Sequence, residues 1–165
     1  MDKSVCLFGA GGHSKVIKDI ALSRGYIVNF FLVDNPTEEY LHNIPIVNTK
    51  ELESFSSKDF IIAIGSNKVR KRIAEENKIN YISLIHSKTI VSHFSTLGKG
   101  TVLMPNAVIN SDVSIGKHVI VNSGAIIEHD CQVGDYVHIS PNATITGGVS
   151  TVSYTHLTLP TTSRV

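Results

Sequence analysis

The sequence predicts an α/β domain with a parallel sheet, followed by a parallel β-helix built from six-residue repeats. Three observations lead to this prediction. Short β-branched runs alternate with helical stretches over residues 1–86, a glycine-rich turn joins the first strand to the first helix, and beyond residue 95 an aliphatic residue recurs at every sixth position. The chain has 165 residues, which is enough for two small domains.

The first 86 residues alternate strands and helices. Apolar residues in the first helical stretch recur at helical spacing, and Gly25 follows it in the position of a helix C-cap. Alternation of this kind places helices on the faces of a parallel sheet. The expected elements are strands at 4–8, 27–33, 60–64 and 81–85, and helices at about 13–24 and 68–77.

A six-residue repeat dominates the second half of the chain. From Ser95 onward, consecutive hexapeptides have a small residue or valine in first place and an aliphatic residue in third place. An ordinary sheet gives no reason for such a period to persist, whereas a triangular prism needs it because the third residues point into a narrow interior. The third residues are Leu97, Leu103, Ile109, Ile115, Val121, Ile127, Val133, Ile139 and Ile145.

Glycines recur at one place in each turn of the expected prism. Gly98, Gly116 and Gly134 lie 18 residues apart, which corresponds to three hexapeptides. We expect glycine or asparagine at such corners because a positive φ costs them little. Cys131 falls in an inward first position, so we expect it to be a small core residue rather than a nucleophile.

Composition and charge narrow the possible functions. The net charge is +1 and hydrophobic residues make up 42% of the chain, so we expect a globular protein that does not bind nucleic acid. No apolar run approaches the roughly 18 residues of a membrane span, and no signal peptide is recognisable, which makes the cytoplasm the expected location. The basic cluster of Lys68, Arg70, Lys71 and Arg72 is interpreted as the solvated face of a helix.

Three loops of the first half are expected to meet at one edge of the sheet. The stretch GAGGHS stands between a strand and a helix, where the N–H groups of a helix N-terminus bind anions. It lacks the third glycine of G-x-G-x-x-G, so the ordinary dinucleotide fingerprint is incomplete. Asp34 ends the second strand and Gly65-Ser66-Asn67 follows the third, at the carboxyl ends where parallel sheets bind ligands.

A strand–GAGGH–helix unit followed by hexapeptide repeats resembles the family of sialic acid O-acetyltransferases and UDP-4-amino-sugar N-acetyltransferases. The likeness covers residues 1 to about 150. It implies a Rossmann-like domain that binds a nucleotide sugar over residues 1–86, and a left-handed β-helix of about three coils over residues 87–150. It also implies a homotrimer that binds acetyl-CoA, as co-substrate, between neighbouring helices, with no metal.

The resemblance also implies roles for the three loops. In the family, the glycine loop, the acidic strand end and the Gly-x-Asn turn contact the nucleotide and its phosphates. The residues that match these positions, and that we expect to bind the substrate, are Gly11, Gly12, His13, Asp34, Gly65 and Asn67.

Acetyl transfer from a thioester needs a base that removes the proton of the attacking amine or hydroxyl. His129 is the candidate, because histidine titrates near neutral pH and because Glu128 or Asp130 can orient its ring. The stretch E-H-D-C resembles the family's E-H-x-C motif, whose histidine is the general base. The predicted catalytic residues are therefore His129, Asp130 and Glu128.

The resemblance further implies an acetyl-CoA contact for His138, and Gly147 and Gly148 lie where an amide for the oxyanion is expected. His118 is interpreted as a solvated corner residue. Beyond Ser150 the hexapeptide pattern is lost, and residues 151–165 read like translated linker sequence. We therefore expect the native frame to stop near Ser150 and the chain to be a truncated family member whose activity is uncertain.

Three other functions remain open. A trimeric carbonic-anhydrase-like enzyme would hold zinc with histidines such as His118, His129 and His138, although a nucleotide-binding domain has no purpose in that chemistry. A non-catalytic nucleotide-sugar-binding protein is the second alternative. A sugar nucleotidyltransferase is the third, but the basic glycine loop expected there is missing.

Overall fold

The computed structural model describes residues 3–158. Its first half is a parallel sheet in the order β3-β4-β2-β1-β5-β6, with only β3 antiparallel to its neighbour. The expected strands at 4–8, 27–33 and 60–64 and both expected helices are confirmed to within two residues. The elements are β1 (Ser4–Phe8), α1 (Gly12–Ser23), β2 (Ile27–Val33), β3 (Tyr40–Leu41), β4 (Ile44–Asn48), the 3-10 helix η1 (Thr49–Phe55), β5 (Asp59–Ile62), α2 (Asn67–Glu76) and β6 (Asn80–Tyr81).

A hairpin at one edge of this sheet was not predicted from the sequence. The strands β3 and β4 are joined by His42 and Asn43, which both have a positive φ, as two-residue hairpin turns require. Only two residues of β3 pair, so the repetition of apolar residues that would reveal a strand is absent. β4 extends the parallel sheet beside β2.

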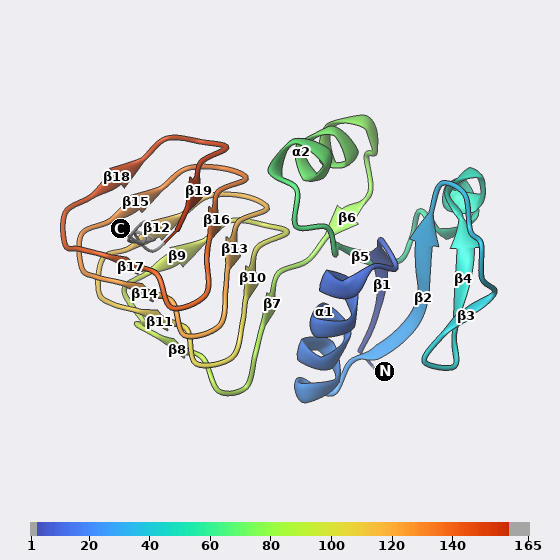
Figure 1. Cartoon of the computed structure of the whole chain (residues 1–165), viewed down its shortest axis with the longest axis horizontal. Helices are drawn as coiled ribbons and strands as arrows, with labels where there is room; N and C mark the ends of the chain where they lie inside the picture. Colours follow the sequence, from blue (N-terminus) through green and yellow to red (C-terminus); the bar gives the residue numbers. More distant parts are fainter. Residues whose placement is uncertain (1–2, 159–165) are drawn as a thin grey trace, which may run out of the picture.

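The second half is a three-sided prism of short parallel strands (Figure 1). Each strand pairs with the strand 18 residues further on, for example Val102 with Ile120 and Ile120 with His138. One face consists of β7 (Leu84–Ile85), β10 (Val102–Leu103), β13 (Ile120–Val121), β16 (His138–Ile139) and β19 (His156–Leu157). The second consists of β8 (Ile90–Val91), β11 (Val108–Ile109), β14 (Ile126–Ile127) and β17 (Thr144–Ile145), and the third of β9 (Thr96–Leu97), β12 (Ser114–Ile115), β15 (Gln132–Val133) and β18 (Ser150–Thr151).

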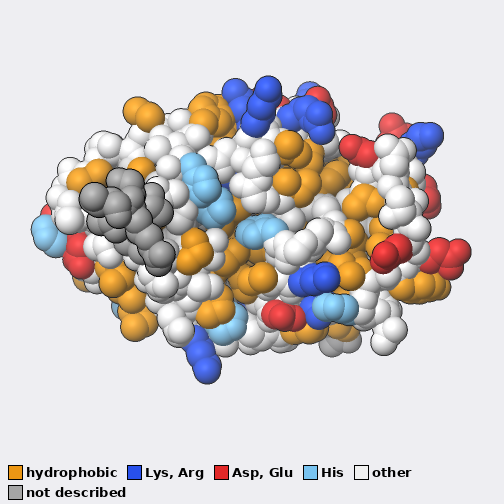
Figure 2. Space-filling view, viewed as in Figure 1, with side chains coloured by type: hydrophobic (Ala, Val, Ile, Leu, Met, Phe, Trp, Pro, Cys, Tyr) orange, Lys and Arg blue, Asp and Glu red, His pale blue; other side chains and the backbone are white. Residues whose placement is uncertain are grey.

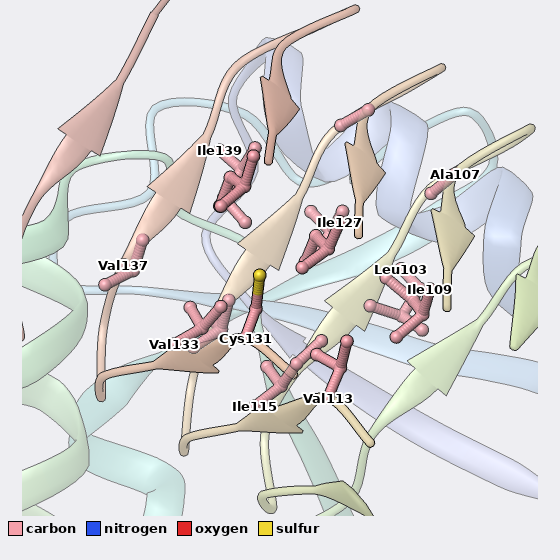
Figure 3. Packing of buried hydrophobic residues seen from close by; sticks show 14 of the residues in the cluster. Leu103, Ala107, Ile109, Val113, Ile115, Ile127, Cys131, Val133, Val137 and Ile139 are labelled. Carbon is pink, nitrogen blue, oxygen red and sulfur yellow. The ribbon is translucent and has the colours of Figure 1, made fainter. Parts of the chain in front are cut away.

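The interior of the prism confirms the six-residue pattern. One buried cluster contains first-place residues such as Ala107 and Cys131 together with third-place residues such as Ile127 (Figure 3). Cys131 is fully buried, as predicted. Because successive coils stack these side chains directly upon one another, each coil depends on its neighbours for burial.

The glycines of the fourth place are required for a different reason from the one expected. Positive φ angles occur instead at the sixth place, where Asp112, His118 and Tyr136 adopt them. Gly98 does not have a positive φ, but a Cβ there would lie 2.5 Å from the backbone of Gly116 in the next coil. Close stacking of coils therefore excludes a side chain at the fourth place of this side.

The structure divides the expected strand at 81–85 between the two halves. Asn80–Tyr81 pairs with β5 of the first sheet, whereas Leu84–Ile85 pairs with β10 and begins the prism. Strand pairing in the prism also continues beyond Ser150, because Ser150–Thr151 and His156–Leu157 pair with β15 and β16. Whether residues 151–165 are native stays a prediction, and residues 159–165 lie outside the described part of the chain.

The two halves share one apolar cluster. α1 lies between the first sheet and the prism (Figure 1), and its Ile17 and Ile20 belong to the same cluster as Val102 and Ile120. The second-place residues explain this contact, since they point outward from the prism and are apolar on the face that meets α1. Within residues 3–158, neither helix is long and apolar enough to cross a bilayer.

Candidate functional site

The predicted catalytic residues lie on an exposed corner of the prism, between β14 and β15. His129 and Asp130 have side chains that are 65% and 66% exposed, and His129 Nδ1 lies 2.7 Å from Asp130 Oδ2. Asp130 adopts a φ of 60°, which belongs to the sixth place of the repeat. The hydrogen bond that Asp130 accepts from the ring, and then the negative charge of Asp130, raise the pKa of His129 above its ordinary value.

Glu128 has a different partner. Its Oε2 accepts a hydrogen bond of 2.8 Å from Asn110 Nδ2, at the same place of the preceding coil. Glu128 adds only the smallest contribution to the raised pKa of His129. Of the two candidate orienting carboxylates, the structure therefore brings Asp130 to the imidazole.

Gly147 and Gly148 lie one coil above this pair. A Cβ on Gly147 would lie 2.8 Å from both Cε1 and Nε2 of His129, so the imidazole ring rests over the Gly147 backbone. The N–H of Gly148 donates to the carbonyl of His129 at 2.9 Å and is occupied by this bond. Among the described residues, no hydrogen-bond acceptor is found for the Gly147 N–H.

The loops predicted to bind the nucleotide lie at the N-terminal end of α1. The helix begins after Gly11, without a side-chain cap and without an acidic residue in its first turn. Gly11 and Gly12 are exposed, and a Cβ on either would meet no atom within 4 Å, so the start of the helix is open to solvent. A groove lined by Ala10, Gly11 and Val33 continues toward the β2–β3 connection.

Position 9 requires a glycine, which was not predicted from the sequence. Its φ is 103°, and a Cβ there would lie 2.8 Å from Ile64. The predicted residue Asp34 stands at the end of β2, where its carboxylate accepts a hydrogen bond from Thr49 at 3.0 Å. It does not line the groove itself, although its neighbours Val33 and Asn35 do.

His13 and His138 meet where the two halves of the molecule join. Their ring centroids are 6.5 Å apart, and His138 also contacts the backbone of Gly65. Burial lowers the pKa of each to about 4, with smaller contributions from His156 and Arg70 for His138 and from Arg70 for His13. Within the described residues, His13 Nε2 is buried without a hydrogen-bond partner. His138 thus lies beside the glycine loop, on a different side of the prism from His129.

Asn67 is already engaged within the chain. Its amide donates to the carbonyls of Tyr154 and Thr155 at 3.1 Å each, and its oxygen accepts from Arg70 at 2.9 Å. The structure therefore gives Asn67 a role at the junction, and its contact with a nucleotide sugar stays a prediction.

Two residues interpreted as solvated are in fact buried. Arg70 is 1% exposed, because it shares the inner face of α2 with Ile73 rather than the outer face with Lys68 and Arg72. The three-residue spacing between Arg70 and Ile73 was the signal that could have revealed this. His118 is 5% exposed, stacked on Tyr136 and edge-on to Tyr81. Several exposed basic side chains lie over α2, and others are scattered across the same face (Figure 2).

The three histidines of the zinc alternative do not converge within one chain. His118 is covered by two tyrosine rings, His129 stands on an open corner, and His138 faces α1. Among residues 3–158, no group of three or more His, Cys, Asp or Glu side chains is arranged to hold a metal ion.

Comparison with known proteins matches both halves of the chain. Residues 4–77 match the PglD N-terminal domain, and residues 94–127 and 112–147 match the bacterial transferase hexapeptide repeat. The UDP-N-acetylbacillosamine N-acetyltransferase of Bacillus subtilis (strain 168) is 38% identical over 62% of this chain and 51% of its own length. The chain thus spans about half the length of this curated relative.

Solved structures share the whole arrangement. The acetyltransferase domain of PglB from Neisseria gonorrhoeae FA1090, in complex with acetyl coenzyme A, is 32% identical with a TM-score of 0.82, over 91% of this chain and 76% of that one. A variant of perosamine N-acetyltransferase from Caulobacter crescentus, in complex with CoA and GDP-perosamine, is 29% identical with a TM-score of 0.81, over 89% and 73%. The predicted fold, a Rossmann-like domain followed by a left-handed β-helix, is confirmed. The chain therefore belongs to the family of proteins that join a PglD N-terminal domain to a β-helix of bacterial transferase hexapeptide repeats.

Proposed function

We propose that this protein transfers the acetyl group of acetyl-CoA to the amino group of a nucleotide-linked sugar. The observation that carries the proposal is the pair of His129 and Asp130, held at 2.7 Å on an exposed corner with the imidazole ring over Gly147. The relatives support the reaction class. The Bacillus subtilis and Caulobacter crescentus proteins are named as N-acetyltransferases, the latter solved with CoA and GDP-perosamine, and the Neisseria gonorrhoeae domain is named as an acetyltransferase domain and was solved with acetyl coenzyme A.

In the proposed mechanism, His129 acts as the general base. Asp130 holds Nδ1 of the ring, which leaves Nε2 to accept the proton that the amine loses as its nitrogen bonds to the thioester carbon. The negative charge on the carbonyl oxygen is stabilised by the N–H of Gly147, since that of Gly148 is already bound to His129. The tetrahedral intermediate then collapses, the carbon–sulfur bond breaks, and the imidazolium returns its proton so that CoA leaves as a thiol.

In this proposal the nucleotide sugar binds at the N-terminal end of α1. The open first turn at Gly11 and Gly12 presents N–H groups and the positive end of the helix dipole to a diphosphate. The groove beside Gly11 receives the nucleoside. His13, Gly65 and His138 form the wall between the diphosphate and the prism.

We also propose a homotrimer, which the resemblance implied. Outward-facing residues of the β8–β11–β14 face are apolar. In the single chain Ile90, on this face, is 65% exposed, and Phe94, four residues later, is 76% exposed. Exposed apolar surface of this kind marks contact sites between chains. Light scattering at several protein concentrations tests this, and a monomer throughout would contradict it.

The deciding experiment measures thiol release from acetyl-CoA with a panel of UDP- and GDP-linked 4-amino sugars and free sialic acid. It is run on this chain and on a chimera that continues with the C-terminal coils of the Neisseria gonorrhoeae domain, because the chain spans only part of its relatives. Release with an amino sugar supports the proposal, whereas release with sialic acid alone would replace N-acetylation by O-acetylation. No release in either protein, together with measurable nucleotide-sugar binding, would favour the non-catalytic binding protein.

A further inference from the structure

Arg70 is the most extensively hydrogen-bonded side chain at the junction of the two halves. Its Nε donates to the carbonyl of His118 at 2.7 Å, and Nη1 donates to the carbonyls of Ile64 and Gly65 at 3.1 and 3.0 Å. Nη2 donates to Asn67, and to the carbonyls of Tyr136 and Val137 at 2.9 and 3.4 Å. All five N–H groups of the guanidinium are therefore used, which leaves none for a phosphate.

The acceptors on the prism explain why an arginine is needed. His118 and Tyr136 occupy the sixth place of two adjacent coils, and their positive φ turns their carbonyls out of the ladder that joins the coils. In the described part of the chain, no backbone N–H donates to either carbonyl. Because this corner is covered by α2, both oxygens would be buried and unpaired without Arg70.

The same side chain holds the predicted nucleotide loop. Gly65 is one of its acceptors, and the Val137 carbonyl belongs to the residue before His138. The guanidinium is planar and rigid, so it fixes the height of the loop along the prism axis relative to two particular coils. Burial lowers the pKa of Arg70 only to about 10, so the charge persists at neutral pH.

We propose that Arg70 is a positioning residue that sets the nucleotide-sugar loop against the coil that carries His138, through its bonds to Gly65 and to the carbonyls of His118 and Tyr136. This inference rests on the proposed function for its effect on the reaction. Its geometric part, the fixed register between loop and coil, stands independently of that function. None of the acceptors of Arg70 belongs to the corner formed by His129, Asp130 and Gly147, so we expect the main effect on the nucleotide-sugar side.

The test compares Arg70→Met, Arg70→Lys and Arg70→Ala with Arg72→Met. Arg72 is a matched control because it lies on the same helix, is largely exposed and makes only a 3.9 Å contact with Glu76. For Arg70→Met we expect the KM for the nucleotide sugar to rise at least about tenfold, with the KM for acetyl-CoA changed by less than about twofold. Arg70→Lys should recover part of the loss, because an ammonium donates to at most three of the acceptors.

Guanidinium rescue separates positioning from general stability. Millimolar guanidinium chloride should restore nucleotide-sugar affinity to Arg70→Ala, although the same ion destabilises proteins in general. Folded Arg70→Met with both KM values unchanged would overturn the inference, as would equal rises in both. Should Arg70→Met fail to fold, Arg70→Lys and the rescued Arg70→Ala decide the matter.

Hydrogen exchange gives an outcome that does not depend on turnover. In Arg70→Met, protection should fall in segments 64–70, 117–120 and 136–140, which contain its hydrogen-bond acceptors, and stay unchanged in the prism segment 107–115. A uniform fall would show a merely structural role and would overturn the inference. If the wild-type protein transfers no acetyl group, the proposed function fails, whereas hydrogen exchange and the affinity for UDP and GDP still decide the role of Arg70.

Discussion

The prism corner and the domain junction place histidines in opposite environments. At the corner, His129 stands in water beside a carboxylate, which raises its pKa. At the junction, His13 and His138 are partly buried, and this burial lowers the pKa of each to about 4. The carboxylate therefore favours the protonated imidazole at the corner, whereas burial favours the neutral imidazole at the junction.

The largest effect expected from this comparison is the loss of turnover in His129→Gln. Because a positioned base contributes about 10²- to 10⁴-fold, kcat should fall by at least about a hundredfold while nucleotide-sugar affinity stays nearly unchanged. His93→Gln is the matched control, since His93 occupies the same place two coils earlier, is exposed, and is followed by Phe94 instead of a carboxylate. Steady-state kinetics on both variants would contradict the assignment if their kcat values were equal.

The second prediction concerns the prism that supports the corner. Ile127 is fully buried, so Ile127→Ala should lower the free energy of unfolding by about 2–5 kcal/mol. Ile126 is its neighbour in β14 but points outward and is only partly buried, so Ile126→Ala should cost under about 1 kcal/mol in the isolated chain. Urea unfolding below the concentration at which chains associate measures both, and equal losses would contradict the inward and outward assignment.

The third prediction uses a junction histidine that is remote from the chemistry. The pKa of His118 falls from 6.5 to about 4, first because of burial and then because of Arg70, whereas the unfolded chain binds the proton near 6.5. The unfolded state therefore takes up more protons between these values, and stability should fall by on the order of 2 kcal/mol as pH drops from 6.5 to 4.

His118→Phe should remove part of this acid sensitivity. Tyr136, at the same place of the next coil, shows that an aromatic ring is accepted at a positive φ, here 60°. The change also removes Nδ1, which is buried without a partner among the described residues. Unfolding curves at pH 7 and pH 4.5 for both proteins measure the effect, and an unchanged difference between the two pH values would contradict it.

The smallest effect is a displacement of the pH profile. His129 must be neutral to accept a proton, so kcat/KM should rise with pH through its raised pKa. Asp130→Asn removes the hydrogen bond and the charge that raise this pKa, and should move the acid limb toward lower pH. Glu128→Gln should move it less, because Glu128 is bound to Asn110. A limb at the same pH in Asp130→Asn and the wild type would show that another group controls the profile.

Much of the fold was predictable because it depends on local repetition. The period of six identifies the inward residues directly, and Ile127 and Cys131 lie in the core as expected. The first and last strands of the prism were harder to predict from the sequence. Leu84–Ile85 begins it and Leu157 keeps its third-place phase, but short strands at the ends of a repeat carry too few residues to stand out.

The sequence by itself determined the order of the two folds, the corner that carries His129 and Asp130, and the glycine loop at the start of α1, because each depends on neighbours in sequence or on a fixed period. Only the tertiary structure decided what lies between the halves. Nothing in the sequence marks Arg70 and His118 as buried or His138 as partly covered, and their surroundings follow from the docking of α1 and α2 on one face of the prism. Contacts between segments 48 to 125 residues apart leave no periodic signal, so the burial of a charge there becomes visible only when both surfaces are in place.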